Sequence, residues 1–465
     1  MRRAISSAAR SATPRVFVHV METRLRTSKG ALRCRIGENI QFTTSSLESY
    51  FFARWEPIAY DAMVVAAAVE FADRTQRRPS SSWRREFELR IPVHDVHHWR
   101  STRVENALRD ALEFLTGDRW LIDFHARRTP ADQPHQGSLS LDPQVRAVMP
   151  FSNGLDSWAV AGLMERQLGD QFVRIRLGSG WKRGKPLWRE RQAFTAIPYK
   201  VRHGRRPFVE SSARSRGFTF ALISGLAAYL AHAGTIIIPE SGQGALGPSL
   251  VAVGQTYEDY RNHPLFTRRM ELFLQALLGH RVNYDFPQLW NTKAETLRRF
   301  VNECSDSSWS RTRSCWQQNR QVAVDNKWRH CGVCAACMLR RMSIHAAGLQ
   351  ESKETYVWEN LSAITFGSGA AASFKREKIT PAMRQYAIAG TLHLDHLAAL
   401  LDSAVNAPTL DLATYQLGLV LGIRETEVRR KLDRLIRQHS REWKDFMSSL
   451  GKNSFLAQWA LSERS

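Results

Sequence analysis

Hydrophobic and polar residues alternate in three short stretches of the first 140 residues. The stretches are residues 16–20, 87–91 and 120–124. A period of two is typical of β-strands that bury one face. The pattern therefore predicts at least three strands before the middle of the chain.

Helical periodicity separates these strands. Residues 62–72 are apolar almost throughout and are predicted to be a helix, and apolar residues recur at helical spacing over 104–115. Asp61 stands directly before the first of these runs, and we expect its carboxylate to cap that helix. Residues 129–137 are rich in Pro, Gln and Asp, which is typical of a linker. The first 140 residues are thus predicted to form a separate α/β domain.

The middle of the chain, residues 141–350, repeats a strand–helix–strand rhythm. Strands alternating with helices predict a parallel sheet with helices on both faces. The predicted strands are 145–151, 172–177, 194–201 and 235–239, and the predicted helices are 157–167 and 218–232.

The last part of the chain, residues 351–465, is predicted to be helical. Val428, Leu432, Leu435 and Ile436 recur on one face of a basic helix. The run 417–421 ends at a glycine, so the two segments have the outline of a helix–turn–helix. We interpret the pair as a helical packing element and do not infer DNA binding from it.

Composition is that of a folded protein without a membrane span. The chain has 465 residues, of which 43% are hydrophobic and 24% charged. No apolar run reaches the ~20 residues that a membrane helix needs. Residues 1–14 are rich in Arg, Ser and Ala, as in a transit peptide, but we interpret them as a short basic tail. We therefore expect a cytoplasmic protein.

The net charge is +22, from 66 basic and 44 acidic residues. Such a field attracts nucleotides, nucleic acid or an acidic partner, without choosing among them. An arginine-rich proteome would produce the same excess with no functional meaning. Charge alone leaves both interpretations open.

Four of the six cysteines fall within 23 residues: Cys315, Cys331, Cys334 and Cys337. Four thiolates complete a tetrahedral zinc shell and leave no open position for chemistry. We therefore predict a structural Zn²⁺ site, with His330 as a possible substitute for one thiolate.

Two other interpretations of the cysteines fit less well. An iron–sulfur motif of this type needs its fourth cysteine where this chain has Arg341. A disulfide framework needs a short, cysteine-dense secreted chain. Neither condition is met, so zinc is preferred.

A short polar turn follows the first strand of the middle region. It contains Ser152, Asn153, Gly154, Asp156 and Ser157. Backbone N–H groups at a helix start bind anions, and glycine lets the backbone approach a ligand closely. Aspartate repels a bare phosphate but binds Mg²⁺ that bridges phosphates. A helix cap without a ligand would show the same residues.

The segment 151–157 resembles the phosphate loop of PP-loop ATP pyrophosphatases, with Asn153 in place of the first glycine of Ser-Gly-Gly-x-Asp-Ser. The cysteine segment, from Thr312 to Arg340, is similar to the zinc segment of QueC, the 7-cyano-7-deazaguanine synthase family. Residues 216–220 and 292–295 resemble two further stretches of that family, in the same order.

This resemblance covers about residues 145–349. It implies a central parallel sheet of the adenine-nucleotide alpha-hydrolase-like (PP-loop) type, with an additional amino-terminal α/β domain and a helical extension. The extra ends are similar to those of QatC, the QueC-like component of Qat anti-phage defence systems. Partner proteins of a defence operon are then expected.

The resemblance also implies chemistry and site residues. QueC enzymes use ATP with Mg²⁺ to adenylate a 7-deazaguanine carboxylate, which an amine then attacks. Asp156 is expected to bind the metal. Arg216, Lys293 and Arg340 are expected to neutralise the substrate carboxylate or the phosphates. Residues 181–191 are a candidate lid. The residues expected to bind ATP are Ser152, Asn153, Gly154, Asp156 and Ser157.

The acceptor of the acyl group is open at this point. Ammonia, a partner protein and a nucleic-acid base are all amines that fit the chemistry. We hypothesise that the amino-terminal domain docks a macromolecular acceptor. Two alternative functions are a catalytically degenerate nucleotide-binding scaffold and a nucleic-acid-modifying enzyme.

Overall fold

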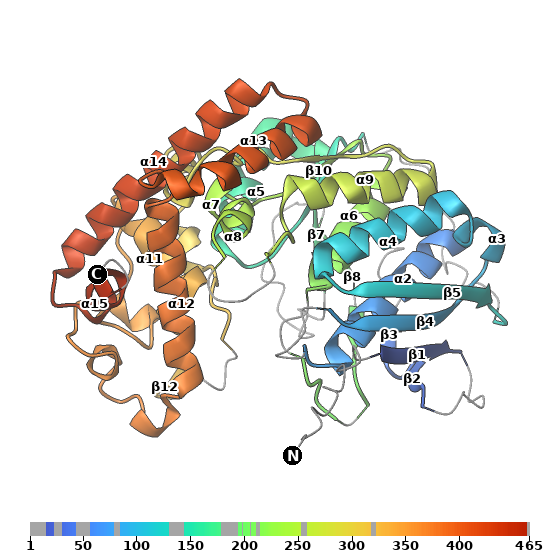
Figure 1. Cartoon of the computed structure of the whole chain (residues 1–465), viewed down its shortest axis with the longest axis horizontal. Coiled ribbons are helices and arrows are strands. Elements are labelled where there is room, and N and C mark those ends of the chain that lie inside the picture. Colours follow the sequence, from blue (N-terminus) through green and yellow to red (C-terminus); the bar gives the residue numbers. More distant parts are fainter. Residues whose placement is uncertain are drawn as a thin grey trace, which may run out of the picture.

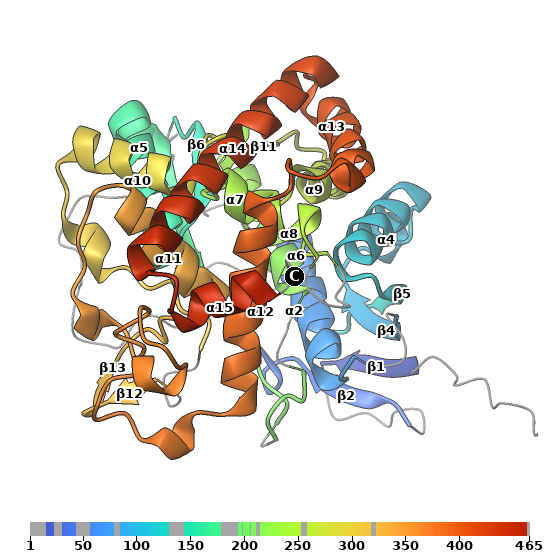
Figure 2. The same ribbon diagram turned by 60° about the vertical axis from the view of Figure 1, so that its left-hand side comes forward.

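The computed structural model contains two parallel β-sheets and a helical carboxyl-terminal region (Figures 1 and 2). In Figure 1 the amino-terminal sheet and helices α11, α12 and α15 lie at opposite sides of the molecule. The structure describes residues 15–22, 30–42, 56–78, 84–129, 144–177, 194–197, 199–204, 206–210, 214–252, 258–317 and 322–462.

The amino-terminal sheet has four parallel strands in the order β2-β1-β4-β5. All three alternating stretches predicted from the sequence are strands of this sheet. Val18 pairs with Leu89, which pairs in turn with Ile122, so apolar positions that pack on the main core line up across the sheet. The strands are β1 (Arg15–Met21), β2 (Leu32–Arg35), β4 (Glu86–Val93) and β5 (Arg119–Ala126).

Both predicted helices of this region form, as α2 (Pro57–Thr75) and α4 (Thr102–Thr116). The prediction that Asp61 caps the first one is wrong. The helix begins at Pro57, five residues earlier than predicted, because proline suits the first turn of a helix. Asp61 is buried inside it and accepts hydrogen bonds from the backbone N–H and the ring of His94.

The central sheet has five parallel strands in the order β11-β10-β6-β7-β8. The predicted strand over 194–201 is instead two strands, and the second, β9 (Tyr199–Val201), pairs with β3 (Ile40–Phe42). Proline at 198, between them in the sequence, has no N–H to donate to a ladder. The five strands are β6 (Ala147–Pro150), β7 (Phe172–Leu177), β8 (Phe194–Ile197), β10 (Thr235–Ile237) and β11 (Asn283–Asp285).

Helices cover both faces of this sheet, as the alternation of strands and helices predicts. Ala147 and Met149 face a core formed with α5 (Leu155–Leu168) and α10 (Lys293–Cys304). Val148, between them, faces the opposite core, formed with α6 (Arg216–Leu230) and α9 (Pro264–Leu278). Strand periodicity therefore places α5 and α6 on opposite faces.

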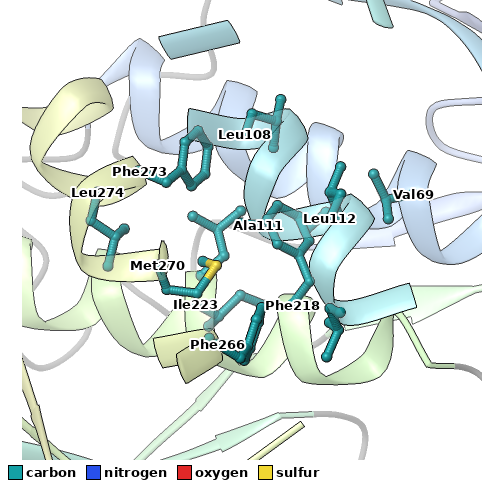
Figure 3. Close-up of a cluster of buried hydrophobic side chains, with 14 of the residues drawn as sticks. Val69, Leu108, Ala111, Leu112, Phe218, Ile223, Phe266, Met270, Phe273 and Leu274 are labelled. Atoms are coloured by element: carbon teal, nitrogen blue, oxygen red, sulfur yellow. The ribbon is translucent and has the colours of Figure 1, made fainter. Parts of the chain in front are cut away.

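The two sheets share one apolar core. Figure 3 shows side chains of α2, α4, α6 and α9 converging, with Val69, Leu112, Phe218 and Phe273 among them. These residues come from both sides of the domain boundary predicted near residue 140. The amino-terminal sheet is thus packed against the central region through its helices.

The carboxyl-terminal region is helical, as predicted, and packs on the cysteine segment. Cys331, Cys334 and Cys337 lie in the same buried cluster as Trp443 and Leu456. The helices are α11 (Ala335–Ala346), α12 (Pro381–Ala398), α13 (Ala407–Leu421), α14 (Glu425–Leu450) and α15 (Phe455–Ser462).

The segment 417–421 and the basic helix do form a helix–turn–helix, with Gly422 at φ 65° ending α13. Leu417, Val428, Leu432 and Leu435 are all buried in the main core, so the pair is a packing element, as interpreted from the sequence.

The remaining elements are short. They are α3 (Val96–Trp99), α7 (Gly242–Ala245), α8 (Gly247–Leu250), β12 (Ala323–Val324), β13 (Lys327–Trp328) and 3-10 turns at Gly169–Gln171, Ser308–Arg311, Lys353–Thr355, Gly367–Gly369, Arg376–Lys378 and Ala404–Asn406.

Three predicted features lie wholly or mostly outside the described residues: the basic tail 1–14, the linker 129–137 and the candidate lid 181–191. Among the described helices, none combines the length and apolarity required to cross a membrane.

Candidate functional site

The candidate site lies where the strand order of the central sheet reverses. From β6 the chain proceeds outward to β7 and β8, and then returns to the other side of β6 to form β10 and β11. In open α/β sheets, ligands bind at such a point, outside the carboxyl ends of the strands. The segments that follow β6 and β10 therefore flank the candidate site.

The segment after β6 is the polar turn singled out in the sequence. The Ser152 hydroxyl accepts a hydrogen bond from the Gly154 N–H over 3.1 Å and lies 2.9 Å from the Ser157 hydroxyl. Helix α5 starts at Leu155 without a side-chain cap. Its first N–H groups thus lack the partner that a capping residue would supply, which suits an anion.

Asn153 stands where the resembling loop has its first glycine, and its backbone is not left-handed. The described non-glycine residues with positive φ are His232, Ser305, Asp325 and Asn326. Gly154 itself has φ −75°. A side chain at position 153 is therefore compatible with this loop without backbone strain.

Asp156, Lys293 and Glu240 come together beside this turn. One carboxylate oxygen of Asp156 forms an ion pair with the Lys293 ammonium. The other, Oδ1, is buried and has no hydrogen-bond partner. Burial lowers the pKa of Lys293, but the charges of Asp156 and Glu240 outweigh burial and raise it above its ordinary value. The charged Lys293 therefore lies beside a buried carboxylate oxygen that lacks a hydrogen-bond partner.

Glu240 follows β10 and was not identified from the sequence. Burial, followed by the negative charge of Asp156, raises the pKa of Glu240 to about 7. The charges of Lys293 and Arg261 partly oppose the rise, as does a hydrogen bond that Asn262 donates to Glu240 Oε2 over 3.0 Å. A carboxyl group with this pKa can exchange a proton near neutral pH.

The start of α10 fixes the position of Lys293. Thr292 and Glu295 form a capping box, in which each side chain accepts the other residue's backbone N–H. The Lys293 N–H donates to Gln243 Oε1 over 2.8 Å. The 292–295 stretch noted in the sequence is therefore a helix start that presents Lys293 to Asp156.

Arg216 begins α6 but does not reach this cluster directly. It is exposed, and its guanidinium lies 5.2 Å from the ring centre of Phe220. Arg261 lies between the two: Gly217 has no side chain, and a Cβ there would be 3.0 Å from Arg261 Cγ. Partial burial and the charge of Arg261 lower the pKa of Arg216.

Arg340 is fully buried and its guanidinium is occupied by protein groups. It forms an ion pair with Glu351 over 2.6 Å and donates to the Thr312 hydroxyl over 2.6 Å. Arg340 therefore holds the segment around Thr312 in place. That segment contacts the polar turn at 152–157, which we call the candidate phosphate loop. The Arg313 N–H donates to the Asn153 carbonyl over 2.6 Å.

The sulfur atoms of Cys315, Cys331, Cys334 and Cys337 all lie within 4.8 Å of one another. The Cys331 and Cys337 sulfurs are 3.7 Å apart, close to the roughly 3.8 Å expected between thiolates bound at about 2.3 Å around one zinc ion.

Backbone N–H groups support the sulfurs. Cys331 N–H donates to Cys315 Sγ over 3.2 Å, and Cys334 N–H donates to Cys331 Sγ over 3.2 Å. Such hydrogen bonds stabilise thiolate charge in metal centres. The four residues thus fit a metal such as zinc.

His330 is not a member of this four-sulfur group. The histidine is buried against Tyr356, with ring centres 5.8 Å apart, rather than lying on the surface. All six cysteines lie in the described residues, and none of them is joined in a disulfide there.

Comparison with known proteins matches part of the chain to a family model. Residues 244–348 match the family model described as Queuosine biosynthesis protein QueC. The matched segment contains Lys293, Arg340 and all four clustered cysteines, whereas the turn at 152–157 and Glu240 precede it. The resemblance is therefore confirmed at the level of a QueC-like segment. No curated protein matches the chain.

Proposed function

We propose that the chain uses ATP to adenylate a carboxylate and then transfers the activated acyl group to an amine. One observation carries this proposal: Asp156, Lys293 and Glu240 meet at the switch point of a parallel sheet, beside an uncapped helix start. The QueC-like match at 244–348 supports ATP-dependent ligase chemistry of this kind.

The reaction has two steps. A carboxylate oxygen attacks the α-phosphorus of ATP, and the bond to pyrophosphate breaks. The amine nitrogen then attacks the carbonyl carbon, the bond to AMP breaks, and the amine gives up a proton. Both steps bring anions together, so cationic groups at the site lower the barrier.

Each residue at the site has a proposed part. The N–H groups that start α5, with the Ser152, Asn153, Gly154 and Ser157 positions, bind phosphate oxygens. The free Oδ1 of Asp156 would bind Mg²⁺, which neutralises the phosphates. Lys293 neutralises negative charge as pyrophosphate departs. Glu240, with a pKa of about 7, accepts the proton of the amine.

Two of the arginines take different roles. Arg340 is a positioning residue, since it holds the Thr312–Arg313 segment against the phosphate loop. Arg216, exposed near Arg261, neutralises the carboxylate of the acid substrate at the mouth of the site. The four cysteines bind Zn²⁺ and stabilise the segment that Arg340 holds.

The substrate is proposed to be a 7-carboxy-7-deazaguanine-type acid, by resemblance to QueC. The additional ends, which resemble those of QatC, favour a cytoplasmic component of an anti-phage defence system. On this view the acceptor is either ammonia or the amine of a partner protein docked on the amino-terminal sheet.

Release of pyrophosphate tests the proposal. We expect ATP and 7-carboxy-7-deazaguanine to yield pyrophosphate with the zinc-loaded protein, and hydroxylamine to trap the acyl group as a hydroxamate. Asp156→Ala should abolish both products, whereas Asp170→Ala, which changes an exposed aspartate in the 3-10 turn after α5, should retain them. Equal turnover by both variants would contradict the proposal.

Two other functions are distinguished by the same assay. A degenerate scaffold would bind ATP without releasing pyrophosphate. An enzyme that modifies nucleic acid would release pyrophosphate only when a nucleic-acid acceptor is added. The buried ion pair of Lys293 favours catalysis over a scaffold, because an inert fold gains little from burying charge.

A further inference from the structure

Helix α14 has two opposite faces of different chemistry. Its apolar positions, including Val428, Leu432 and Leu435, are buried in the main core. Its outer face carries exposed cations at intervals of four, three and four residues, which is the spacing of one helix stripe. We name this stripe the arginine ridge, and it consists of Arg430, Arg434, Arg437 and Arg441.

The ridge borders an open hollow of about 490 Å³, lined also by Arg429, Asp433 and Thr426. Acidic residues neutralise only part of the positive charge around this hollow. Arg429 bonds to Asp433 over 2.9 Å, and Arg434 pairs with Glu295. Within the described part of the chain, Arg430 and Arg437 form no ion pair. The ridge therefore keeps a net positive charge facing solvent.

We propose that the arginine ridge binds the phosphodiester backbone of a nucleic acid. Its four positions span about 16 Å at a rise of about 1.5 Å per residue. Phosphates of one strand of a duplex recur about every 3.4 Å along the axis. One guanidinium is thus available for every one or two phosphates, and guanidinium is the side chain best shaped for bidentate contact with phosphate.

A nucleic acid fits this surface better than an acidic protein does. Protein interfaces have an apolar, often aromatic centre surrounded by polar residues. Between residues 426 and 441, the exposed positions of α14 are Thr426 and the four arginines of the ridge. Phosphate backbone contacts need cations and little else, and the net charge of +22 adds long-range attraction.

The ridge also borders the helix that presents Lys293. Arg434 pairs with Glu295, which belongs to the capping box at the start of α10. A bound nucleic acid would lie along the outside of this helix, and Figures 1 and 2 both show α14 at the periphery of the molecule. The binding surface does not depend on the proposed adenylation, and its test uses no substrate.

Fluorescence anisotropy with a short DNA duplex and an RNA duplex of the same sequence tests the proposal. Four phosphate contacts predict a loss of affinity on the order of a hundredfold between 50 and 200 mM salt. The variant Arg430→Glu/Arg437→Glu/Arg441→Glu should weaken binding by at least about tenfold and reduce the salt slope by about three. Whichever duplex binds more tightly identifies the nucleic acid.

A matched control changes the net charge equally at another place. Lys353→Glu/Lys375→Glu/Arg384→Glu alters three exposed cations outside α14, and should bind both duplexes nearly as the unaltered protein does. Equal weakening by the two triple variants would overturn the proposal, because binding would then follow net charge. So would stronger binding of polyglutamate than of either duplex, which would indicate an acidic protein partner.

Discussion

Arg313 donates its backbone N–H to the carbonyl oxygen of Asn153 over 2.6 Å. This hydrogen bond joins the cysteine segment to the candidate phosphate loop, although 160 positions separate the two residues in the sequence. Cys315 lies two residues beyond Arg313. The four-cysteine cluster is therefore linked to the loop through this short backbone segment.

Loss of the metal should consequently weaken nucleotide binding as well as the fold. We expect Cys334→Ser, or a zinc chelator, to lower the thermal midpoint by several degrees and to weaken ATP binding, because thiolate ligation contributes directly to folding. Cys304→Ser, a half-buried thiol outside the cluster, should change neither property. Unchanged ATP affinity in a metal-free, folded sample would show that the connection has no effect.

Gly244 offers a way to displace Glu240 while the fold is kept. A Cβ at position 244 would lie 2.0 Å from Glu240 Oε1, the mobile end of a side chain. At Gly242, a Cβ would lie 2.2 Å from the rigid backbone oxygen of Leu289. We expect Gly244→Ala to remain folded and lose most turnover, and Gly242→Ala to lose stability by roughly 2 kcal/mol or more.

Thermal melts and turnover assays of these two variants check the prediction. Gly234→Ala serves as the control, since a Cβ there meets nothing within 4 Å. A Gly244→Ala protein with unaltered turnover would show that Glu240 takes no part in the reaction.

Glu240 predicts a pH dependence of stability. The folded-state pKa is about 7, above the ordinary value of 4.5, so the folded state binds more protons than the unfolded state between these values. Stability should therefore fall as pH rises from about 4.5 to 7. The full shift corresponds to about 3 kcal/mol, and solvent screening at this half-buried site should reduce it to roughly 1–2 kcal/mol.

Urea unfolding at pH 5, 6, 7 and 8 measures this dependence. The Glu240→Gln variant should lose this pH dependence of the unfolding free energy. Relative to the unaltered protein, it should therefore gain stability at pH 8 and gain little at pH 5. A stability difference that is constant over this range would contradict a raised pKa.

Arg340 and Glu351 form a buried pair, and removing one partner leaves the other charge without compensation. We expect Arg340→Met to cost about 3–5 kcal/mol of unfolding free energy. Arg340→Met/Glu351→Leu should recover part of this loss. Arg299→Met, which breaks an exposed pair with Glu303, should cost less than about 1 kcal/mol. Chemical denaturation of the three variants measures their unfolding free energies. A loss in Arg340→Met no larger than that in Arg299→Met would refute a buried anchoring role.

Most of the secondary structure could be predicted from periodicity. Residues 87–91 and 120–124 alternate because one face of each strand meets a helix, and that constraint is local enough to read in the sequence. The predicted start of α2 is wrong because the Asp61 carboxylate is hydrogen-bonded to His94, more than 30 residues away. A capping propensity cannot anticipate a partner supplied by the tertiary fold.

The candidate site was only partly predictable for the same reason. Asp156 follows a strand in a recognisable polar turn. Glu240 follows a strand too, and its position after the buried run 235–239 was the available signal. Its pairing with Asp156 depends on strand order, which local pattern does not determine. In the sequence, Arg340 is a candidate for neutralising substrate charge. Its ion pair with Glu351 depends on the tertiary fold, which local pattern does not determine.

Calorimetric titration of ATP and Mg²⁺ into the zinc-loaded protein tests the central claim most directly, that the turn after β6 binds the triphosphate. Asn153→Asp adds a negative charge to an exposed position of this turn, and Asn302→Asp makes the same change on the outer end of α10. We predict that Asn153→Asp weakens ATP binding by at least about tenfold, or about 1.4 kcal/mol, and that Asn302→Asp does not. Equal affinities of the two variants, or no ATP binding by the unaltered protein, would contradict the account.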